Sequence, residues 1–227
     1  MPEGGIIFVF ILCVLLVIGG IIYSAIAARK RREELFEFAT QLGLNFSPGN
    51  DYGLADRFGF LDKLAQGSNR YAFNVISGSY RQQQVRVFDY HYETHSTDSK
   101  GRRQTHHHYF SFFILLLAIS FPELKITREG LLSKIAQALG YDDIDFESAE
   151  FSRTFCVRSK HRKFAYDVCN AQMIEYLLAN RDLSLEIEGP ALALAFDTRL
   201  SAAQIEMNLN RLLEVRLRLP EYLFTKV

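Results

Sequence analysis

The chain opens with a run of apolar residues that is long enough to cross a lipid bilayer. Residues 6–28 carry no charged side chain, and the basic cluster Arg29 to Arg32 follows directly. As a helix with a rise of about 1.5 Å per residue, the run would be about 34 Å long, more than the roughly 30 Å of a hydrocarbon core. A helix also satisfies its backbone groups internally, as lipid requires. The pattern therefore predicts a transmembrane helix over residues 6–28, preceded by a short tail of residues 1–5.

Two features distinguish this segment from a cleaved signal peptide. A signal peptide starts with basic residues and has an apolar core of about 7–15 residues. Here residues 1–5 contain no Lys or Arg, and the apolar run is longer. We therefore expect a signal-anchor that stays in the mature protein. Cleavage after Ala25-Ile26-Ala27, which has the spacing of a cleavage site, is the alternative.

Basic residues flank the predicted membrane helix on its C-terminal side only. The positive-inside rule then places the N-terminus outside and the chain after Arg29 in the cytoplasm, as a single-pass protein of the cell (inner) membrane. Arg29, Lys30, Arg31 and Arg32 are also predicted to lie at the membrane surface, where anionic headgroups attract basic side chains. A plain stop-transfer signal explains the same four residues and is left open.

The pattern after the anchor predicts a cytosolic α+β domain that begins with a juxtamembrane helix over residues 29–43. Helical spacing there places Leu35, Phe36, Ala39 and Leu42 on one face. Residues 44–146 are expected to form an antiparallel β-meander followed by a helix. Strands are predicted at 44–46, 70–77, 83–94 and 105–119, with a turn at Gly78-Ser79, a helical turn at 59–64, and a helix at 127–140 whose apolar stripe is Leu131, Leu132, Ile135 and Leu139.

A second half, residues 147–227, is predicted to fold as a β-α-β-β-α unit. The expected elements are a strand at 151–158, a helix at 160–179, a hairpin of 183–188 and 191–197 across Gly189-Pro190, and a last helix from Thr198 or Ser201 to the residue before Pro220. Whether the two halves form one domain or two is open at this point.

Charge and motifs narrow the class of function. Lys and Arg number 26, as do Asp and Glu, so the formal net charge is zero, which argues against a nucleic-acid binder. The sequence has neither a G-x-x-x-x-G-K-[ST] nor a G-x-G-x-x-G loop for a nucleotide, and no G-x-S-x-G elbow of a hydrolase. Cys13, Cys156 and Cys169 follow no zinc-ligand spacing and are expected to be free thiols. We therefore lean toward a protein that is not an enzyme.

Several short stretches occur in an order that is familiar from a known protein family. They are LADRF at 54–58, NVISG at 74–78, VFDY at 87–90, TREG at 127–130 and FAYDV at 164–168, all behind an apolar N-terminal segment. The set resembles a family of single-pass bacterial membrane proteins with a C-terminal cytosolic α+β domain, and the resemblance covers most of residues 29–224. That family has no assigned activity, so the resemblance implies a bacterial membrane protein of unknown function and gives no functional residues to carry over.

One cluster of side chains could carry chemistry. Five of the six histidines lie between His91 and His108, on two arms of a predicted hairpin that closes near Lys100-Gly101. Side chains alternate along a strand, so His91, Glu93 and His95 are expected to share one face. Neutral imidazoles with a carboxylate suit Zn²⁺ or another transition metal. The candidate ligands are His91, Glu93, His95, His106 and His108.

The pairing of the two arms decides which of these residues meet. In one register His95 lies opposite His106 and Glu93 opposite His108, with Cβ atoms about 4.5–5.5 Å apart. In a register shifted by one residue, His107 lies opposite Glu93 instead. A solvated polar hairpin tip without a metal is the simpler interpretation of the same residues, and no cofactor is required by the sequence.

The tether, the apolar core and the lack of a catalytic motif together favour an interaction module. We predict a membrane-anchored cytosolic domain that is not an enzyme and that binds a protein or membrane partner, with the lipid bilayer as one partner and no nucleic acid. The alternative is a metal-binding sensor or a metal-dependent hydrolase built on the histidine-rich hairpin. A purely structural role in the cell envelope is a third interpretation.

Overall fold

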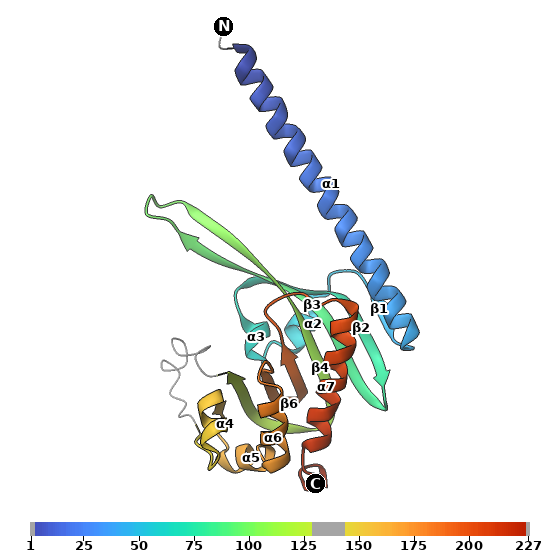
Figure 1. Cartoon of the computed structure of the whole chain (residues 1–227), viewed down its shortest axis with the longest axis vertical. Coiled ribbons are helices and arrows are strands. Elements are labelled where there is room, and N and C mark those ends of the chain that lie inside the picture. Colours follow the sequence, from blue (N-terminus) through green and yellow to red (C-terminus); the bar gives the residue numbers. More distant parts are fainter. Residues whose placement is uncertain (1–2, 129–143, 226–227) are drawn as a thin grey trace.

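The computed structural model describes residues 3–128 and 144–225, and it confirms the α+β class. An N-terminal helix leads into a domain built on an open antiparallel sheet (Figure 1). The helices are α1 (Glu3–Gln41), α2 (Tyr52–Arg57), α3 (Asp62–Ala65), α4 (Ala149–Thr154), α5 (Arg162–Val168), α6 (Ala171–Ala179), α7 (Ala202–Arg218) and α8 (Tyr222–Thr225). The strands are β1 (Asn45–Ser47), β2 (Ser68–Tyr80), β3 (Gln83–Thr97), β4 (Arg103–Arg128), β5 (Phe155–Arg158) and β6 (Leu185–Ala195).

The first helix combines the apolar segment with the start of the folded domain. Within the described residues, α1 is the one helix that is long and apolar enough to cross a membrane, and its most apolar stretch is not buried in the protein. The same helix continues without a break into the domain, where Leu35, Phe38 and Ala39 are buried. Phe36, which the pattern places on the buried face, is 57% exposed. The chain thus carries an N-terminal apolar helix that suits a membrane anchor and is built into the domain.

The sheet is organised around β4, a strand of 26 residues. The strand order is β1-β2-β3-β4-β5, and β6 also pairs with β4; every pairing is antiparallel. Phe112 and Leu116 each pair with both β3 and β6, so these two strands flank β4 on opposite edges. The described strands of both predicted halves therefore belong to one sheet.

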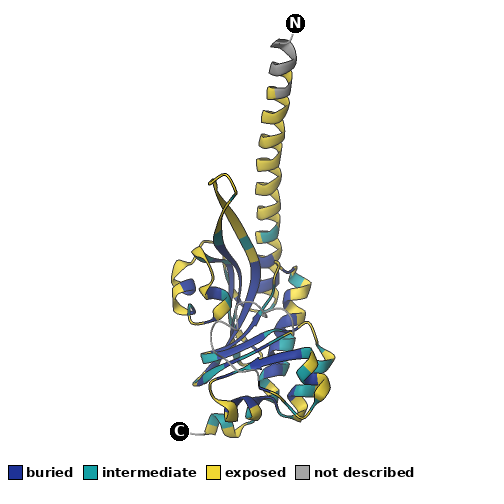
Figure 2. Cartoon of the chain, turned by 90° about the vertical axis from the view of Figure 1, so that its left-hand side faces the viewer, coloured by how far each residue is buried: buried dark blue, intermediate teal, exposed yellow. Residues whose placement is uncertain are grey.

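Apolar side chains cover both faces of the sheet and form two cores. On one face the end of α1 packs with α5, α6 and α7 against residues such as Val87 and Phe113. On the other face α2 and α3 pack against Phe88, Tyr90 and Phe112. Figure 2 shows the buried residues in the sheet and the exposed ones along the upper part of α1 and the tip of the β3–β4 hairpin. This hairpin extends beyond the cores on the same side as the apolar part of α1 (Figures 1 and 2).

Two helices begin where a side chain caps them, at points that the apolar pattern does not show. The first residues of the strand predicted at 151–158 form α4 instead, because Ser148 Oγ accepts a hydrogen bond from a backbone N–H in the first turn. The helix predicted at 160–179 divides into α5 and α6, since Asn170 caps α6 in the same way. A side-chain oxygen at this position satisfies a backbone N–H that has no partner within the helix.

In place of the hairpin predicted across Gly189-Pro190, the structure has a single strand, β6, which pairs with β4. The register between the two strands shifts on both sides of the pair Phe121 and Gly189, and Gly189 has a φ of +54°. A glycine in the left-handed region lets a strand bulge and bend without ending it. One irregular strand therefore takes the place of two predicted ones.

The turn between β2 and β3 also differs from the prediction. It lies at Arg81 and Gln82, which both have positive φ, as a two-residue hairpin turn requires, and not at Gly78-Ser79. The helix predicted at 127–140 falls almost entirely outside the described residues, and β4 continues through Arg128.

Candidate functional site

A buried carboxylate joins α1 to the sheet. Asp89 on β3 is 2% exposed and accepts two hydrogen bonds from the Arg31 guanidinium, from Nε at 2.8 Å and from Nη2 at 2.7 Å. Asn74 Nδ2 and Ser111 Oγ donate to the same carboxylate at 2.9 and 3.1 Å. Arg31 Nη1 also donates to the carbonyl of Leu200, just before α7. One ion pair therefore links α1, three strands and the loop that precedes α7.

The basic residues predicted at the membrane surface divide into two groups. Arg29, Lys30 and Arg32 are exposed, and the first two pair with glutamates one turn further along α1. Arg31 points inward, and only 18% of its side chain is exposed. Arg31 is therefore engaged by Asp89, and a role at the membrane surface is left for the other three.

The β3–β4 hairpin follows the shifted register. His107 pairs with Glu93, and His95 pairs with Thr105. The pairing of His95 with His106 is therefore wrong by one residue, and the alternative that sets His107 against Glu93 is confirmed.

The turn of the hairpin explains the shift. The loop spans Asp98 to Arg102 and is centred on Lys100, whereas the prediction closed it between Lys100 and Gly101. The Asp98 N–H donates to the Arg102 carbonyl at 3.0 Å, and the Asp98 carboxylate accepts from the N–H groups of Lys100 and Arg102 at 2.9 Å. Gly101 has a φ of +77°, which glycine adopts without strain. The Asp98 side chain thus fixes a five-residue loop and with it the register.

Strand alternation and this register bring three side chains together on the sheet face that α1 covers. His91, Glu93 and His107 have ligand atoms within 4.8 Å of one another, and they are the one such trio of His, Cys, Asp or Glu in the described chain. His91 Nε2 lies 3.0 Å from His107 Nδ1, which lies 3.5 Å from Glu93 Oε1. His91 is 1% exposed, and burial lowers its pKa, so that its ring is neutral at pH 7. The trio contains two of the predicted ligands and His107.

Asn69 holds two members of the trio. His91 Nδ1 is 3.0 Å from the Asn69 carbonyl oxygen; a carbonyl only accepts, so Nδ1 carries the proton and the lone pair is on Nε2. Asn69 Nδ2 donates to Glu93 Oε1 at 2.7 Å, and this bond lowers the pKa of Glu93. Asn69 has a φ of +49°, a conformation that Asn tolerates better than most residues. Sequence reasoning missed Asn69, whose only signal is an Asn directly before a predicted strand.

The other predicted ligands point elsewhere. His106 and His108 alternate with His107 and so lie on the opposite face of the hairpin, where their rings contact β3 hydroxyls at 2.9 and 2.8 Å. His95 shares the face of Glu93, but its two ring nitrogens lie beside hydroxyl groups at 3.1 and 3.2 Å. The structure therefore separates the five predicted ligands into two that meet and three that do not.

A second group of charges surrounds Lys125 on β4. Its Nζ lies 2.5 Å from Asp62 Oδ2 and 3.7 Å from Glu186 Oε1, and it also pairs with Glu123. Glu186 is 9% exposed, and burial raises its pKa to about 7, although the Asp62 N–H and Lys125 both act in the opposite direction. These contacts join α3 to β4 and β6, and they make the stability of the domain depend on pH.

We expect Glu186→Gln to reduce this pH dependence. The folded pKa of Glu186, about 7, exceeds the ordinary value of 4.5, so between these pH values the folded chain binds more protons than the unfolded chain. The stabilisation is complete below about pH 4.5 and is lost as the pH rises through 7. The free energy of unfolding of the wild type should fall from pH 5 to pH 8. Glu186→Gln should remove up to about 3 kcal/mol of that fall. Glu221→Gln, at an exposed position, should have the same pH profile as the wild type. An unchanged profile in Glu186→Gln would contradict the assignment of the pH dependence to Glu186.

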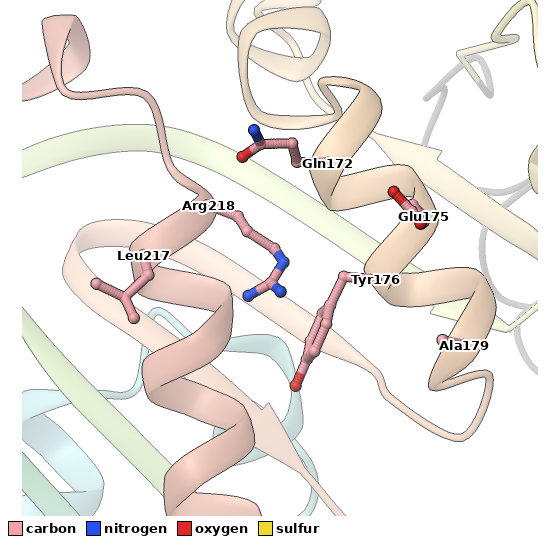
Figure 3. Close-up of a pocket in the computed structure, with 6 residues that line it drawn as sticks. All are labelled: Gln172, Glu175, Tyr176, Ala179, Leu217 and Arg218. Atoms are coloured by element: carbon pink, nitrogen blue, oxygen red, sulfur yellow. The ribbon is translucent and has the colours of Figure 1, made fainter.

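A groove of about 470 Å³ lies between α6 and α7 (Figure 3). Its lining residues are Gln172, Glu175, Tyr176, Ala179, Leu217 and Arg218. The Arg218 guanidinium lies over the Tyr176 ring, 4.1 Å from its centroid, and Leu217 is 74% exposed. The lining residues include no histidine, cysteine or serine. It lies at the end of the domain away from the apolar part of α1 (Figure 1).

The two cysteines of the domain are both buried. Neither Cys156 nor Cys169 is joined in a disulfide, as the sequence predicts. Burial raises the pKa of Cys169 to about 12, which leaves the thiol protonated and unreactive at neutral pH.

Comparisons with known proteins show a likeness in fold. No protein-family model and no curated protein matches the sequence. The structure is similar to the crystal structure of the mycobacterial trehalose monomycolate transport factor A, TtfA, with a TM-score of 0.59. The match covers 85% of this chain and 97% of that chain at 14% sequence identity, so it establishes a shared fold and no more.

Proposed function

We propose that this protein is a membrane-anchored module without catalytic activity, which serves as an accessory factor for an integral membrane protein. The observation that carries the proposal is the link between the anchor and the domain. The Arg31–Asp89 ion pair and the buried side chains of α1 make the helix part of the fold, so the domain is held in a defined orientation at its anchor. A flexible tether would be enough for a soluble enzyme that only needs to stay near the membrane.

The basic residues support a domain that sits close to anionic headgroups. Arg29, Lys30 and Arg32 are exposed at the end of the apolar run, and the hairpin tip carries Lys100 and Arg103 on the same side of the domain (Figure 2). Each basic residue near an anionic surface contributes about 1 kcal/mol of attraction. By the positive-inside rule, this is the cytoplasmic surface of the inner membrane.

The fold likeness adds a second line of support. TtfA is named as a transport factor for trehalose monomycolate. We therefore infer that this chain also assists transport or assembly at a membrane. A metal-dependent function is the second candidate, favoured by the trio His91, Glu93 and His107.

Site-specific photo-crosslinking in native membranes tests the proposal. A benzophenone amino acid is placed at Tyr52, Met207 or Leu217, which are exposed on different parts of the domain. We expect at least one position to give an adduct with an integral membrane protein, and we expect the same adduct when residues 6–28 are replaced by an unrelated apolar helix of equal length. If all three positions yield only self-adducts or soluble proteins, the proposal is wrong.

A further inference from the structure

We infer that His91, Glu93 and His107 form a binding site for one divalent transition metal ion, with Zn²⁺ as the best fit. Two imidazole nitrogens and one carboxylate oxygen are a donor set that Zn²⁺ accepts in sites with three protein ligands and a fourth open position. This trio differs from the five ligands that the sequence indicates, because the hairpin register selects His107 and excludes His95, His106 and His108.

The distances in the trio agree with this ion. In a tetrahedral site with bonds of about 2.05 Å, neighbouring ligand atoms lie about 3.3 Å apart. The observed separations are 3.0 Å between the two imidazole nitrogens and 3.5 Å between His107 Nδ1 and Glu93 Oε1. The remaining pair also lies within 4.8 Å. Small rotations of the side chains are therefore enough to close the site.

One ligand is already fixed in the form that binds metal. His91 is buried, its Nδ1–H donates to the Asn69 carbonyl, and its ring stacks on Tyr71 with centroids 4.5 Å apart. Its Nε2 lone pair therefore points into the trio. A hydrogen bond from the far nitrogen to a carbonyl is the usual support of a metal-bound histidine. Asn69 supports a second ligand through its bond to Glu93 Oε1.

The third ligand is free to adjust. About half of the His107 side chain is exposed (52%), and without metal its Nδ1–H donates to His91 Nε2. Metal binding needs the other tautomer of His107, with the proton on Nε2. Solvent at the exposed ring can supply the proton to Nε2 and accept the proton that leaves Nδ1 when the metal binds there. The open coordination position then lies on the solvent side, where water completes the shell.

The test uses the full chain, purified in detergent without a histidine tag, freed of metal and titrated with Co²⁺. Tetrahedral Co²⁺ absorbs in the visible range, and Zn²⁺ added afterwards should displace it. We expect one ion per chain, with affinity at least about tenfold lower in His107→Ala and in Glu93→Gln. Asn69→Gly, which keeps the carbonyl and removes the bond to Glu93, should weaken binding by about tenfold.

His106→Ala is the matched control, because this neighbour lies on the opposite face of the same strand. It should bind as the wild type does, and near-ultraviolet circular dichroism should show that all variants are folded. The inference is overturned if the wild type takes up neither Co²⁺ nor Zn²⁺. It is equally overturned if His107→Ala binds as tightly as His106→Ala. Neither result bears on the crosslinking outcome, so the metal site and the proposed interaction role fail independently.

Discussion

Arg31→Ala is expected to lower the free energy of unfolding by about 3–5 kcal/mol. The substitution removes both charge-assisted hydrogen bonds to Asp89 and leaves a carboxylate that is 2% exposed without its counter-charge. Asn74 and Ser111 still donate to that carboxylate, but neither carries a charge. Urea unfolding of the full chain, followed by near-ultraviolet circular dichroism of the tyrosines because the sequence has no Trp, measures the loss.

Two further variants separate the contributions to this effect. Arg31→Lys keeps the charge but cannot reproduce the two parallel bonds of a guanidinium, so its loss should be intermediate. Arg29→Ala removes an exposed ion pair two positions earlier on the same helix, and it should change the stability by less than about 1 kcal/mol. A loss in Arg31→Ala no greater than in Arg29→Ala would show that the buried pair does not stabilise the fold.

Gly67→Ala is expected to destabilise the domain by about 3 kcal/mol. Gly67 has a φ of +64°, which costs an alanine about 1 kcal/mol. A Cβ at this position would also lie 2.3 Å from the Glu93 carbonyl oxygen and 2.6 Å from Cδ2 of Tyr92. The backbone of β3 cannot move aside easily, because it is paired on both edges, so overpacking adds about 2 kcal/mol.

Gly101→Ala is the control for Gly67→Ala. Its φ of +77° imposes the same backbone strain, but nothing lies within 4 Å of an added Cβ. It should therefore lose only about 1 kcal/mol. Equal losses in the two variants, measured by the same urea unfolding, would mean that the contact between Gly67 and β3 is not as close as described.

The hydrophobic pattern predicts the anchor and most of the sheet because both follow from the local sequence alone. An uncharged run of 23 residues, the alternation along β3 and the apolar stretch in β4 need no knowledge of distant contacts. The boundaries at Ser148 and Asn170 were missed because a single capping hydrogen bond decides them. The sequence predicts a turn at Gly189 where β6 only bends, because a glycine followed by a proline is typical of both a turn and a bulge.

The candidate site depends even more on contacts between residues that are distant in the sequence. Composition locates the histidines and Glu93 on one hairpin. The choice between His106 and His107 depends on the centre of the loop, which lies half a residue away from the predicted centre. Asn69 enters the site through the β2–β3 pairing, which joins residues 22 positions apart. The role of Arg31 depends on its pairing with Asp89, 58 positions away. Contacts of this kind follow from the folded sheet and cannot be deduced from local pattern.

We infer that the anchor helix and the domain form one rigid unit, which fixes the distance between them in a bilayer. Spin labels are placed at Ser24→Cys on α1 and at Ser99→Cys at the hairpin tip, in a chain with Cys13 replaced by Ser. Pulsed electron paramagnetic resonance in lipid nanodiscs then measures the distance between the two labels. We predict a single narrow distance distribution for the otherwise wild-type chain and a broad one after Arg31→Ala. A distribution that is broad in both chains would show that a flexible tether joins the helix to the domain.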